Sequence, residues 1–302
     1  MVGSALLRRL ESEDCETVTA TRGELDLRDR AATRDWLRDV RPDAVFCAAA
    51  KVGGIQANDS APADFLQENL EIQLSVIDAS YRAGVGKLLF LGSSCIYPRQ
   101  APQPIPETAL MTGPLEPTNQ WYAVAKIAGI MQCQAYRRQH GCNFISAMPT
   151  NLFGAGDNYH PTNSHVVAAL LRKAHEAKVA DKAKLEIWGT GTPRREFLYA
   201  DDCADALVFL MQHYNQETPV NVGTGEDITI TELAETVARI VGYTGSFEYN
   251  LEKPDGMPRK LLDVSRIKAL GWQPRTSLED GLAVAYRDFC AREAAPMEAQ
   301  GA

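Results

Sequence analysis

The sequence predicts an α/β protein with a doubly wound parallel sheet, followed by a smaller mixed α/β region. Short apolar runs alternate with longer amphipathic patterns through the first half of the chain. Strands and helices that alternate at this spacing indicate right-handed βαβ units and therefore parallel strands. The apolar density of residues 45–50 (VFCAAA) and 88–92 (LLFLG) is typical of strands that are covered on both faces.

Each element follows from its own pattern. An amphipathic, basic pattern opens the chain and predicts a helix at residues 3–10. In chain order, the next patterns predict a strand at 16–22, a helix at 31–40, a strand at 43–50, a helix at 63–84, a strand at 87–94, a helix at 121–141 and a strand at 143–150.

The pattern changes after about Pro149, where shorter strands are interleaved with helices at 229–241 and 277–292. Thr229 and Glu232 have the T-x-x-E spacing of a capping box, which marks the start of the first of these helices. We therefore expect an N-terminal domain over 1–150 and a C-terminal domain over 151–302, of which some segments return to the first. The tail at 291–302 is expected to be frayed.

Composition excludes several classes of function. The chain has 302 residues, 45% of them hydrophobic, which is enough for a well-filled core. A net charge of −8 with scattered basic residues argues against nucleic-acid binding. No apolar run approaches the ~20 residues of a membrane helix, and no signal peptide is recognisable, so we expect no membrane partner and a cytoplasmic location.

Seven cysteines form no CxxC pair and have no Cys/His metal spacing. They indicate free thiols in a reducing compartment, and we expect no bound metal.

Tyr122 and Lys126 are four residues apart on a predicted helix and so share one face. A phenol has a pKa of ~10, and a nearby ammonium would favour the phenolate, which makes the pair a candidate acid/base device. Alone, the pattern equally fits a half-buried tyrosine beside a solvated lysine. Ser93, Ser94 and Cys95 lie at the C-terminal end of a predicted strand, at the sheet edge where ligands bind in open α/β folds, and this context favours the functional interpretation.

Further motifs extend the match over nearly the whole chain, from Gly3 to about Phe289. They resemble the GDP-L-fucose synthase family of the extended short-chain dehydrogenase/reductase superfamily. The stretches that carry the resemblance are AAAKVGGI, LGSSCIYPR, EPTNQWYAVAKIAGI, MPTNLFG, NSHVVAALLRK, GTPRREFLYADD, NVGTGE and KPDGMPRKLLDVSR. The resemblance implies a Rossmann-like NADP(H)-binding domain that holds the catalytic residues, a C-terminal domain that binds a GDP-sugar, and a homodimer.

The implied reaction inverts C3 and C5 of GDP-4-keto-6-deoxy-D-mannose and then reduces C4. The C4 ketone acidifies both neighbouring C–H bonds, so the reaction needs a base, an acid on the opposite face and donors to the enolate oxygen. The family implies Ser93 and Tyr122 as donors, Cys95 and His165 as the proton-exchanging pair, and Lys126 beside Tyr122. If GSSC is extended, Ser93 and Cys95 point the same way.

Structural alternatives exist for two of these residues. Cys95 by itself fits a small buried hydrophobic residue. His165 by itself fits a surface histidine in the first turn of a helix capped by Asn163 or Ser164, where the helix dipole would lower its pKa.

The cofactor's adenosine end has its own candidates. Arg22 resembles the family's arginine for the 2′-phosphate of NADP, and Asp26 and Leu27 resemble its adenine contact. Glu24 lies close enough to keep NAD open as an alternative. The other implied cofactor residues are Gly3, Leu91, Gly92, Ser93, Ser94, Lys126, Pro149, Thr150, Asn151, Leu152 and His165.

For the GDP end, the resemblance implies Lys173, Trp188, Arg195 and Asp255. Arg195 offers the bidentate guanidinium that suits a pyrophosphate. Lys173 equally fits a solvated helix face, and Trp188 equally fits a core residue.

Gly3 corresponds to the third glycine of the family's G-x-x-G-x-x-G phosphate loop. The resemblance thus places a strand and two glycines upstream of Met1, either in a longer natural protein or lost from a weakly folded or inactive product. A chain without them is expected to be destabilised and to bind NADPH poorly. Another NAD(P)-dependent nucleotide-sugar epimerase or dehydratase, and an impaired nucleotide-sugar-binding protein, are the alternative functions.

Overall fold

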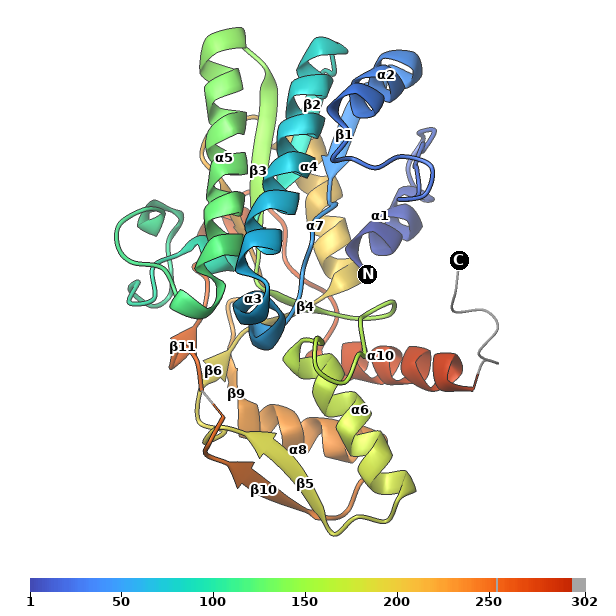
Figure 1. The fold of residues 1–302 in the computed structure, drawn as a ribbon, viewed down its shortest axis with the longest axis vertical. Coiled ribbons are helices and arrows are strands. Elements are labelled where there is room, and N and C mark those ends of the chain that lie inside the picture. The colour runs from blue at the N-terminus through green and yellow to red at the C-terminus, as the bar shows by residue number, and fades with distance from the viewer. Residues whose placement is uncertain (254, 295–302) are drawn as a thin grey trace.

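A four-stranded parallel sheet forms the centre of the upper half of the computed structural model, which describes residues 1–253 and 255–294 (Figure 1). Its order is β1-β2-β3-β8, with crossovers between neighbours as the alternating pattern predicts. The strands are β1 (Ala44–Cys47), β2 (Lys87–Leu91), β3 (Asn143–Pro149) and β8 (Val220–Val222).

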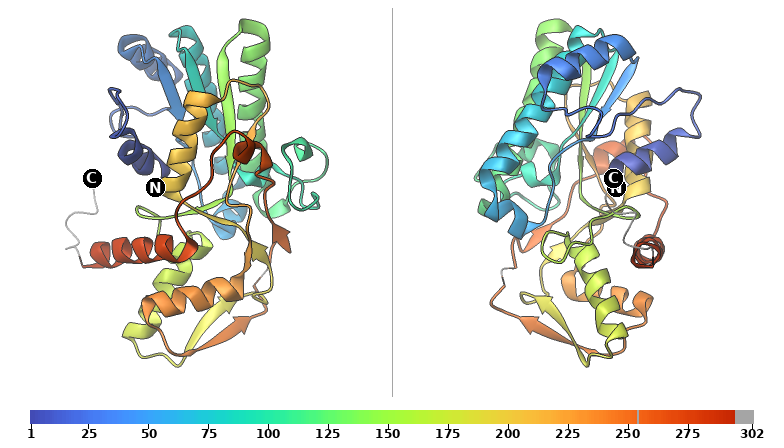
Figure 2. Two further views of the ribbon diagram at one scale, coloured as in Figure 1. Left: turned by 180° about the vertical axis from the view of Figure 1, so that it is seen from behind. Right: turned by 45° about the vertical axis from the view of Figure 1, so that its right-hand side comes forward.

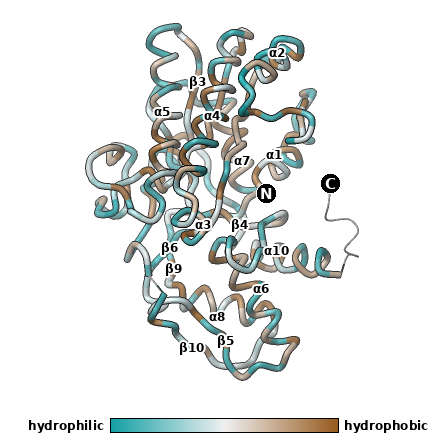
Figure 3. Tube along the Cα trace, viewed as in Figure 1, coloured by the Kyte–Doolittle hydropathy of each residue, from teal (hydrophilic) through white to brown (hydrophobic). Residues whose placement is uncertain are grey.

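Helices cover both faces of this sheet, which makes it a doubly wound, Rossmann-type fold (Figures 1 and 2). One face carries α2 (Arg30–Val40), α4 (Pro62–Arg82) and α5 (Gln120–His140), and the other carries α7 (Ala200–His213) with α1 (Val2–Leu10) beside it. In Figure 3 the outer helices alternate between hydrophobic and hydrophilic stretches along the trace, as expected for helices with one buried side.

The strand predicted at 16–22 is absent, and this prediction was wrong. Residues 16–20 have no secondary structure, and the Val18 side chain is exposed. A strand needs a neighbour to pair its backbone N–H and C=O groups. Among the described residues β1 pairs with β2 alone, so it is an edge of the sheet, and no strand runs beside residues 16–22.

The lower half packs two helices, α6 (Val166–Val179) and α8 (Ile230–Val241), against a parallel pair formed by β5 (Lys184–Trp188) and β10 (Ser246–Asn250). Its hydrophobic core includes Leu171, Ile187 and Val237 and is separate from the core of the sheet. The core of the sheet also contains residues far beyond 150, such as Leu207 and Val264. The domain boundary at residue 150 stays a prediction.

Two small sheets lie between the halves. One pairs β4 (Asn151–Phe153) with β7 (Phe197–Tyr199), and the other has the order β11-β6-β9. The strands of the second sheet are β6 (Arg194–Arg195), β9 (Ile228–Thr229) and β11 (Arg259–Lys260). Their short ladders bring the 194–195 and 259–260 segments together.

The capping box predicted for α8 is confirmed. The Thr229 hydroxyl accepts the N–H of Glu232 at 3.0 Å, and the Glu232 carboxylate accepts the N–H of Thr229 at 2.7 Å. Gly242 then ends the helix in a left-handed conformation, with φ of 76°. The helix predicted at 277–292 is present as α10 (Leu278–Glu293), whereas the predicted frayed tail lies outside the described residues from 295 onward.

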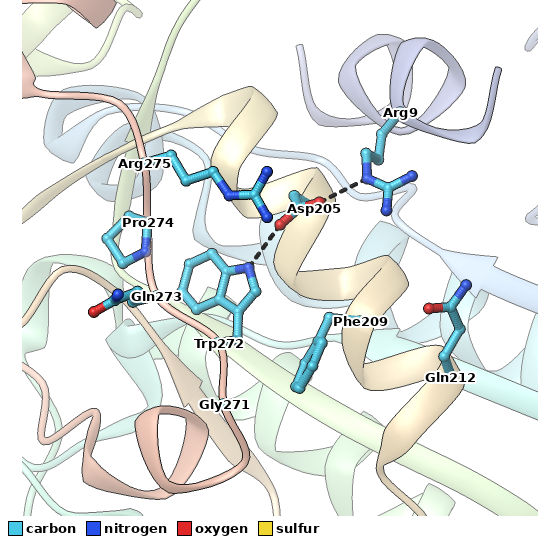
Figure 4. Close-up of a pocket in the computed structure, with 9 residues that line it drawn as sticks. All are labelled: Arg9, Asp205, Phe209, Gln212, Gly271, Trp272, Gln273, Pro274 and Arg275. Carbon is cyan, nitrogen blue, oxygen red and sulfur yellow. Dashed lines mark hydrogen bonds and ion pairs between the residues drawn. The ribbon is translucent and has the colours of Figure 1, made fainter. Parts of the chain in front are cut away.

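Helix α1 is held to the rest of the molecule by side chains. Asp205 of α7 accepts a hydrogen bond from Arg9 at 2.7 Å and another from the indole of Trp272 at 2.8 Å. Arg8 forms a further ion pair with Asp201 at 2.8 Å. Figure 4 shows Asp205 between Arg9 and Trp272 in a pocket lined by α1, α7 and residues 271–275, none of which is a predicted site residue.

The remaining helices are short. They are α3 (Ile55–Ser60), α9 (Ser265–Ala269) and three 3₁₀ helices at Ser94–Ile96, Glu107–Ala109 and Pro117–Asn119. Over the described ranges, none of the helices combines the length and the apolar character that spanning a membrane requires.

Candidate active site

Ser93, Cys95 and Tyr122 come together at the carboxyl end of β2. The chain turns there into the 3₁₀ helix Ser94–Ile96, and the Ser93 hydroxyl caps it by accepting the N–H of Cys95 at 3.2 Å. The expectation of an extended GSSC segment was therefore wrong. Tyr122, in the first turn of α5, nonetheless lies near both residues, since Ser93 and Cys95 each influence its phenol.

Burial, as the largest cause, and then the nearby Cys95 sulfur raise the pKa of the Tyr122 phenol, and the Ser93 hydroxyl partly offsets this. Lys126 is not directed at the phenol. Its ammonium donates to the Leu91 carbonyl at 2.7 Å and lies 5.9 Å from the centre of the Tyr122 ring. The expected shift toward phenolate was wrong because burial dominates, and the phenol is a proton donor at neutral pH.

Lys126 is itself buried, with 3% of its surface exposed. Burial lowers the pKa of its ammonium to about 8, and the charge of Cys47 acts in the opposite direction. Burial likewise raises the pKa of the Cys47 thiol to about 11. A lysine with this titration can change charge close to physiological pH.

Cys95 has two nitrogen donors. The Asn119 amide and the Lys260 ammonium each lie 3.4 Å from its Sγ. Lys260 is on β11, and the pairing of β11 with β6 also brings Arg195 near Cys95. Cys95 is thus a partly exposed thiol with cationic neighbours, which is the environment of a reactive cysteine and not of a core residue.

His165 is the N-cap residue of α6, so the expectation that Asn163 or Ser164 caps this helix was wrong. The residue as a whole is exposed, yet burial of its imidazole among neighbouring groups lowers the pKa, and the positive charge of Lys260 acts in the same direction. Lys260 therefore influences both members of the predicted proton-exchanging pair.

The predicted nicotinamide-side residues gather at the carboxyl ends of β2 and β3. Leu91, Gly92 and Ser94 follow one strand, and Pro149 ends the other. A Cβ on Gly92 would lie 3.2 Å from the Ala147 carbonyl, so a larger residue here would press against β3.

Thr150 and Asn151 are fixed just beyond β3. Thr150 and Asn151 donate to the Glu196 carbonyl at 3.3 and 2.8 Å. Leu152 follows in β4. Their contact with a cofactor stays a prediction.

The predicted adenosine-side residues are exposed. Arg22 has 73% of its side chain exposed and lies 3.7 Å from Glu68. Asp26 pairs with Arg28 at 2.6 Å, and hydrogen bonds from Arg28 lower the pKa of Asp26 to about 2. Leu27 is half-buried against the core of the sheet. Gly3 lies in the first turn of α1 and is exposed, and a Cβ there would meet no other atom of the described residues within 4 Å, so packing does not require a glycine at this position.

Two of the predicted GDP-side residues form a pair in the lower half. Trp188 is 40% exposed, which excludes the core interpretation, and its indole donates to Glu186 at 3.0 Å. Lys173 also reaches Glu186, at 3.2 Å, and its ammonium lies 4.8 Å from the centre of the Trp188 ring. The ammonium of Lys253 lies over the same ring at 5.0 Å.

Arg195 and Asp255, the other two residues predicted for the GDP end, also contact each other. Arg195 donates to the Asp255 carbonyl at 3.3 Å, and its pKa is lowered by burial while the Asp255 charge opposes this. The Asp255 carboxylate accepts from the backbone and hydroxyl of Thr190 at 2.7 and 2.9 Å. The carboxylate thus also fixes the turn that follows Trp188.

Three residues of this region escaped sequence reasoning: Asn119, Lys260 and Glu116. Glu116 lies 3.3 Å from Arg99 and acts electrostatically on Arg195. Asn119 and Lys260 lie within the motifs EPTNQWY and PRKLLDVSR, but no local spacing connects either residue to Cys95.

Fold and site first define a class: a Rossmann-type protein with serine, tyrosine and lysine at the carboxyl edge of its sheet, as in short-chain dehydrogenase/reductases. Residues 1–223 match the NAD dependent epimerase/dehydratase family, and the chain belongs to that family.

Individual relatives are similar over nearly their whole length. GDP-L-fucose synthase of Sinorhizobium fredii is 58% identical over 289 residues, which cover 96% of this chain and 92% of the relative. Among solved structures, a GDP-6-OMe-4-keto-L-xylo-heptose reductase from C. jejuni has a TM-score of 0.90 at 35% identity, covering 96% of this chain and 95% of the other. A GDP-L-fucose synthetase from Naegleria fowleri bound to NADP has a TM-score of 0.89 at 26% identity, covering 97% and 92%.

Proposed function

We propose that this protein converts GDP-4-keto-6-deoxy-D-mannose to GDP-L-fucose by epimerisation at C3 and C5 and NADPH-dependent reduction at C4. The family and the fucose synthase relatives support the reaction class. The observation that carries the proposal is a cationically supported thiol, Cys95, beside the Ser93–Tyr122 pair. A ketone reductase needs the pair alone, whereas an epimerase also needs a base for a carbon acid.

In the reduction, the Tyr122 phenol gives its proton to the C4 oxygen as the ketone becomes an alcohol. Burial keeps that proton on the phenol at neutral pH, and Ser93 orients the hydroxyl. Bound NADPH supplies the hydride to C4. The Lys126 ammonium stabilises negative charge that develops nearby.

In the epimerisation, the Cys95 sulfur removes a proton from C3 or C5, and the C–H electron pair moves onto the C4 oxygen as an enolate. Ser93 and Tyr122 donate hydrogen bonds to that oxygen. His165 then returns a proton to the opposite face, aided by anionic substrate phosphates that raise its proton affinity against the effect of Lys260.

Some of the residues present fit NADP(H). Gly3, in the first turn of α1, is exposed and puts no side chain in the way of a phosphate at the helix N-terminus. Lys126 and the Leu91–Ser94 segment lie at the strand ends where a nicotinamide ribose would bind, and exposed Arg22 is free to pair with a 2′-phosphate. For GDP, we propose Lys173, Trp188, Arg195 and Asp255 as contacts, with Trp188 as the aromatic surface.

Turnover tests the proposal. GDP-4-keto-6-deoxy-D-mannose is added to the purified chain with NADPH, NADPH consumption is followed by absorbance, and the product is identified by NMR. We expect one NADPH consumed per GDP-L-fucose formed. The proposed function would be overturned if the protein neither oxidises NADPH nor, when the reaction is run in D₂O, incorporates deuterium at C3 and C5 of the sugar.

Cys95→Ser separates this enzyme from a plain reductase. The variant should lower the rate of proton exchange at C3 and C5 by about 100-fold or more. It should still reduce a ketone that has already been epimerised. Cys15→Ser, at an exposed thiol distant in sequence from the site, is the matched control and should change neither step. Unchanged exchange in Cys95→Ser would favour a reductase without epimerase activity.

A homodimer and a cytoplasmic location complete the proposal. Large hydrophobic side chains are exposed on the neighbouring helices α4 and α5: Leu74, Tyr81, Trp121, Val124 and Met131. Such a surface suits a second copy of the chain, and light scattering after gel filtration would reveal a monomer if the assignment is wrong. All seven thiols are free, as expected in a reducing compartment.

A further inference from the structure

Lys260 is a buried cation whose partner is a sulfur atom. It is 7% exposed, and its ammonium donates to Cys95 Sγ at 3.4 Å. Among residues 1–253 and 255–294, no carboxylate lies within 4.0 Å of this ammonium. Removing an ammonium from water without an anion is costly. An anionic sulfur would compensate that cost.

Asn119 approaches the same sulfur from another segment. Its amide nitrogen donates to Cys95 Sγ at 3.4 Å, while its amide oxygen is buried without a hydrogen-bond partner among the described residues. The Asn119 side chain is thus oriented so that its NH₂ group donates to the Cys95 sulfur, while its amide oxygen accepts no hydrogen bond. The sulfur receives two N–H donors, a neutral one and a charged one.

The other charged and titratable groups around Cys95 act mostly in one direction. Arg195 interacts with the Cys95 charge, and its positive charge favours an anionic sulfur. Tyr122 is a neutral phenol. His165 faces Lys260, which disfavours a positive charge on its ring. The one carboxylate in this set, Glu116, is next to both Arg99 and Arg195.

We propose that Lys260 and Asn119 are positioning residues for epimerisation, forming a two-donor cradle that holds the Cys95 sulfur as an anion and aims it at the sugar carbon acid. Charge-assisted hydrogen bonds favour the anionic acceptor. The inference rests on the proposed function for the identity of that carbon acid.

The proton balance of the cradle is simple. The thiolate forms an S–H bond as the C–H bond at C3 or C5 breaks, and the electron pair moves onto the C4 oxygen. A proton delivered to the opposite face restores the C–H bond. Cys95 then loses its proton and the acid regains one through solvent, so no electron donor or acceptor is needed.

Lys260→Met tests the cradle without sugar or cofactor. The full chain is treated with iodoacetamide across a pH series, and peptide mapping follows alkylation of Cys95 alone. Loss of an opposite charge at this distance should move the pH midpoint upward by about 1 unit or more. Lys260→Arg should restore most of the shift. Lys184→Met, at an exposed lysine paired with Glu248, is the matched control and should leave the midpoint unchanged.

A second readout uses His165. Without the Lys260 charge, its NMR titration midpoint should also rise, so both groups move in the same variant. An unchanged alkylation midpoint in Lys260→Met would overturn the cradle. If Lys260 instead served only to bind phosphates, KM would rise equally for epimerisation and reduction with unaltered pH profiles, which also overturns it.

Asn119→Asp gives an independent test if Lys260→Met does not fold. A carboxylate in place of the amide would repel the anionic sulfur and move the alkylation midpoint upward as well, and an unmoved midpoint contradicts the proposal. Because alkylation requires no GDP-sugar, a missing turnover would count against the proposed reaction and leave the alkylation result to decide the cradle.

Discussion

The two ends of the candidate active site are built differently. At the sugar end, Ser93 and Tyr122 lie at the edge of the sheet beside the buried Lys126, whose ammonium donates to the Leu91 carbonyl. At the adenosine end, Arg22 and Asp26 extend from an irregular segment and make surface ion pairs. Buried polar groups need hydrogen-bond partners within the fold, whereas exposed charged groups form weak surface ion pairs that a ligand can replace. Changes at the first end should therefore alter chemistry and stability, and changes at the second should alter binding alone.

The largest effect is expected from Tyr122→Phe. Removing the phenolic proton donor should lower kcat for reduction by about 10²–10⁴-fold, because general acid catalysis contributes that much. Single-turnover NADPH oxidation measures it. The activity of Tyr286→Phe, at a tyrosine of α10 outside the proposed site and the proposed dimer surface, should stay near wild type. A loss of less than tenfold would remove Tyr122 from the acid role.

Glu196→Gln should weaken the support beneath the sugar end. This fully buried carboxylate accepts the N–H groups of Gly225 and Leu262 at 2.7 and 3.0 Å. The glutamine amide would place its NH₂ group against one of these two backbone N–H groups, and one hydrogen bond would be lost. The free energy of unfolding should fall by about 1–3 kcal/mol.

Urea denaturation measures this loss. Glu186→Gln is the control, since that carboxylate also has several partners but is half exposed, and it should cost less than about 1 kcal/mol. Equal losses in the two variants would contradict the contrast between buried and exposed polar groups.

A pH profile should reveal Lys126. Its pKa is lowered to about 8, so the ammonium is present below that pH and lost above it. The rate of reduction at saturating NADPH should fall above about pH 8, approaching tenfold per pH unit. Lys126→Arg keeps its charge and should shift the fall to higher pH; a fall at the same pH in both proteins would assign it to another group.

The smallest effect is expected from Arg22→Ala. Loss of an exposed guanidinium should raise KM for NADPH about tenfold, leave KM for NADH unchanged, and leave kcat and the melting temperature near wild type. Steady-state kinetics with both cofactors measures it. Arg38→Ala, at an exposed arginine of α2 paired with Asp35, is the control. An equal rise for NADH would show that Arg22 does not read the 2′-phosphate.

Sequence reasoning reached the parts of the site that local patterns encode. Tyr122 and Lys126 are one helical turn apart, and Ser93 lies at the end of an apolar strand, so spacing together with the βαβ context and the family resemblance predicted a shared site. Lys260 is 165 residues from Cys95, and the pairing of β11 with β6 brings it there. No local pattern carries such a contact.

The misses have physical causes. The 16–22 segment alternates like a strand, but a ladder also requires a neighbour. The pKa of Tyr122 was predicted from its distance to an ammonium, whereas desolvation outweighs that term in a buried site.

The single carboxylate of Asp205 couples three parts of the chain that are distant in sequence. Arg9 and Trp272 both depend on it, so α1 and the 271–275 segment share one anchoring point on α7. Regions that share such an anchor open together in native-state hydrogen exchange. The buried indole of Trp272 should then act as an intrinsic fluorescent reporter, changing its emission in the same opening event that exposes the amides of the first helix.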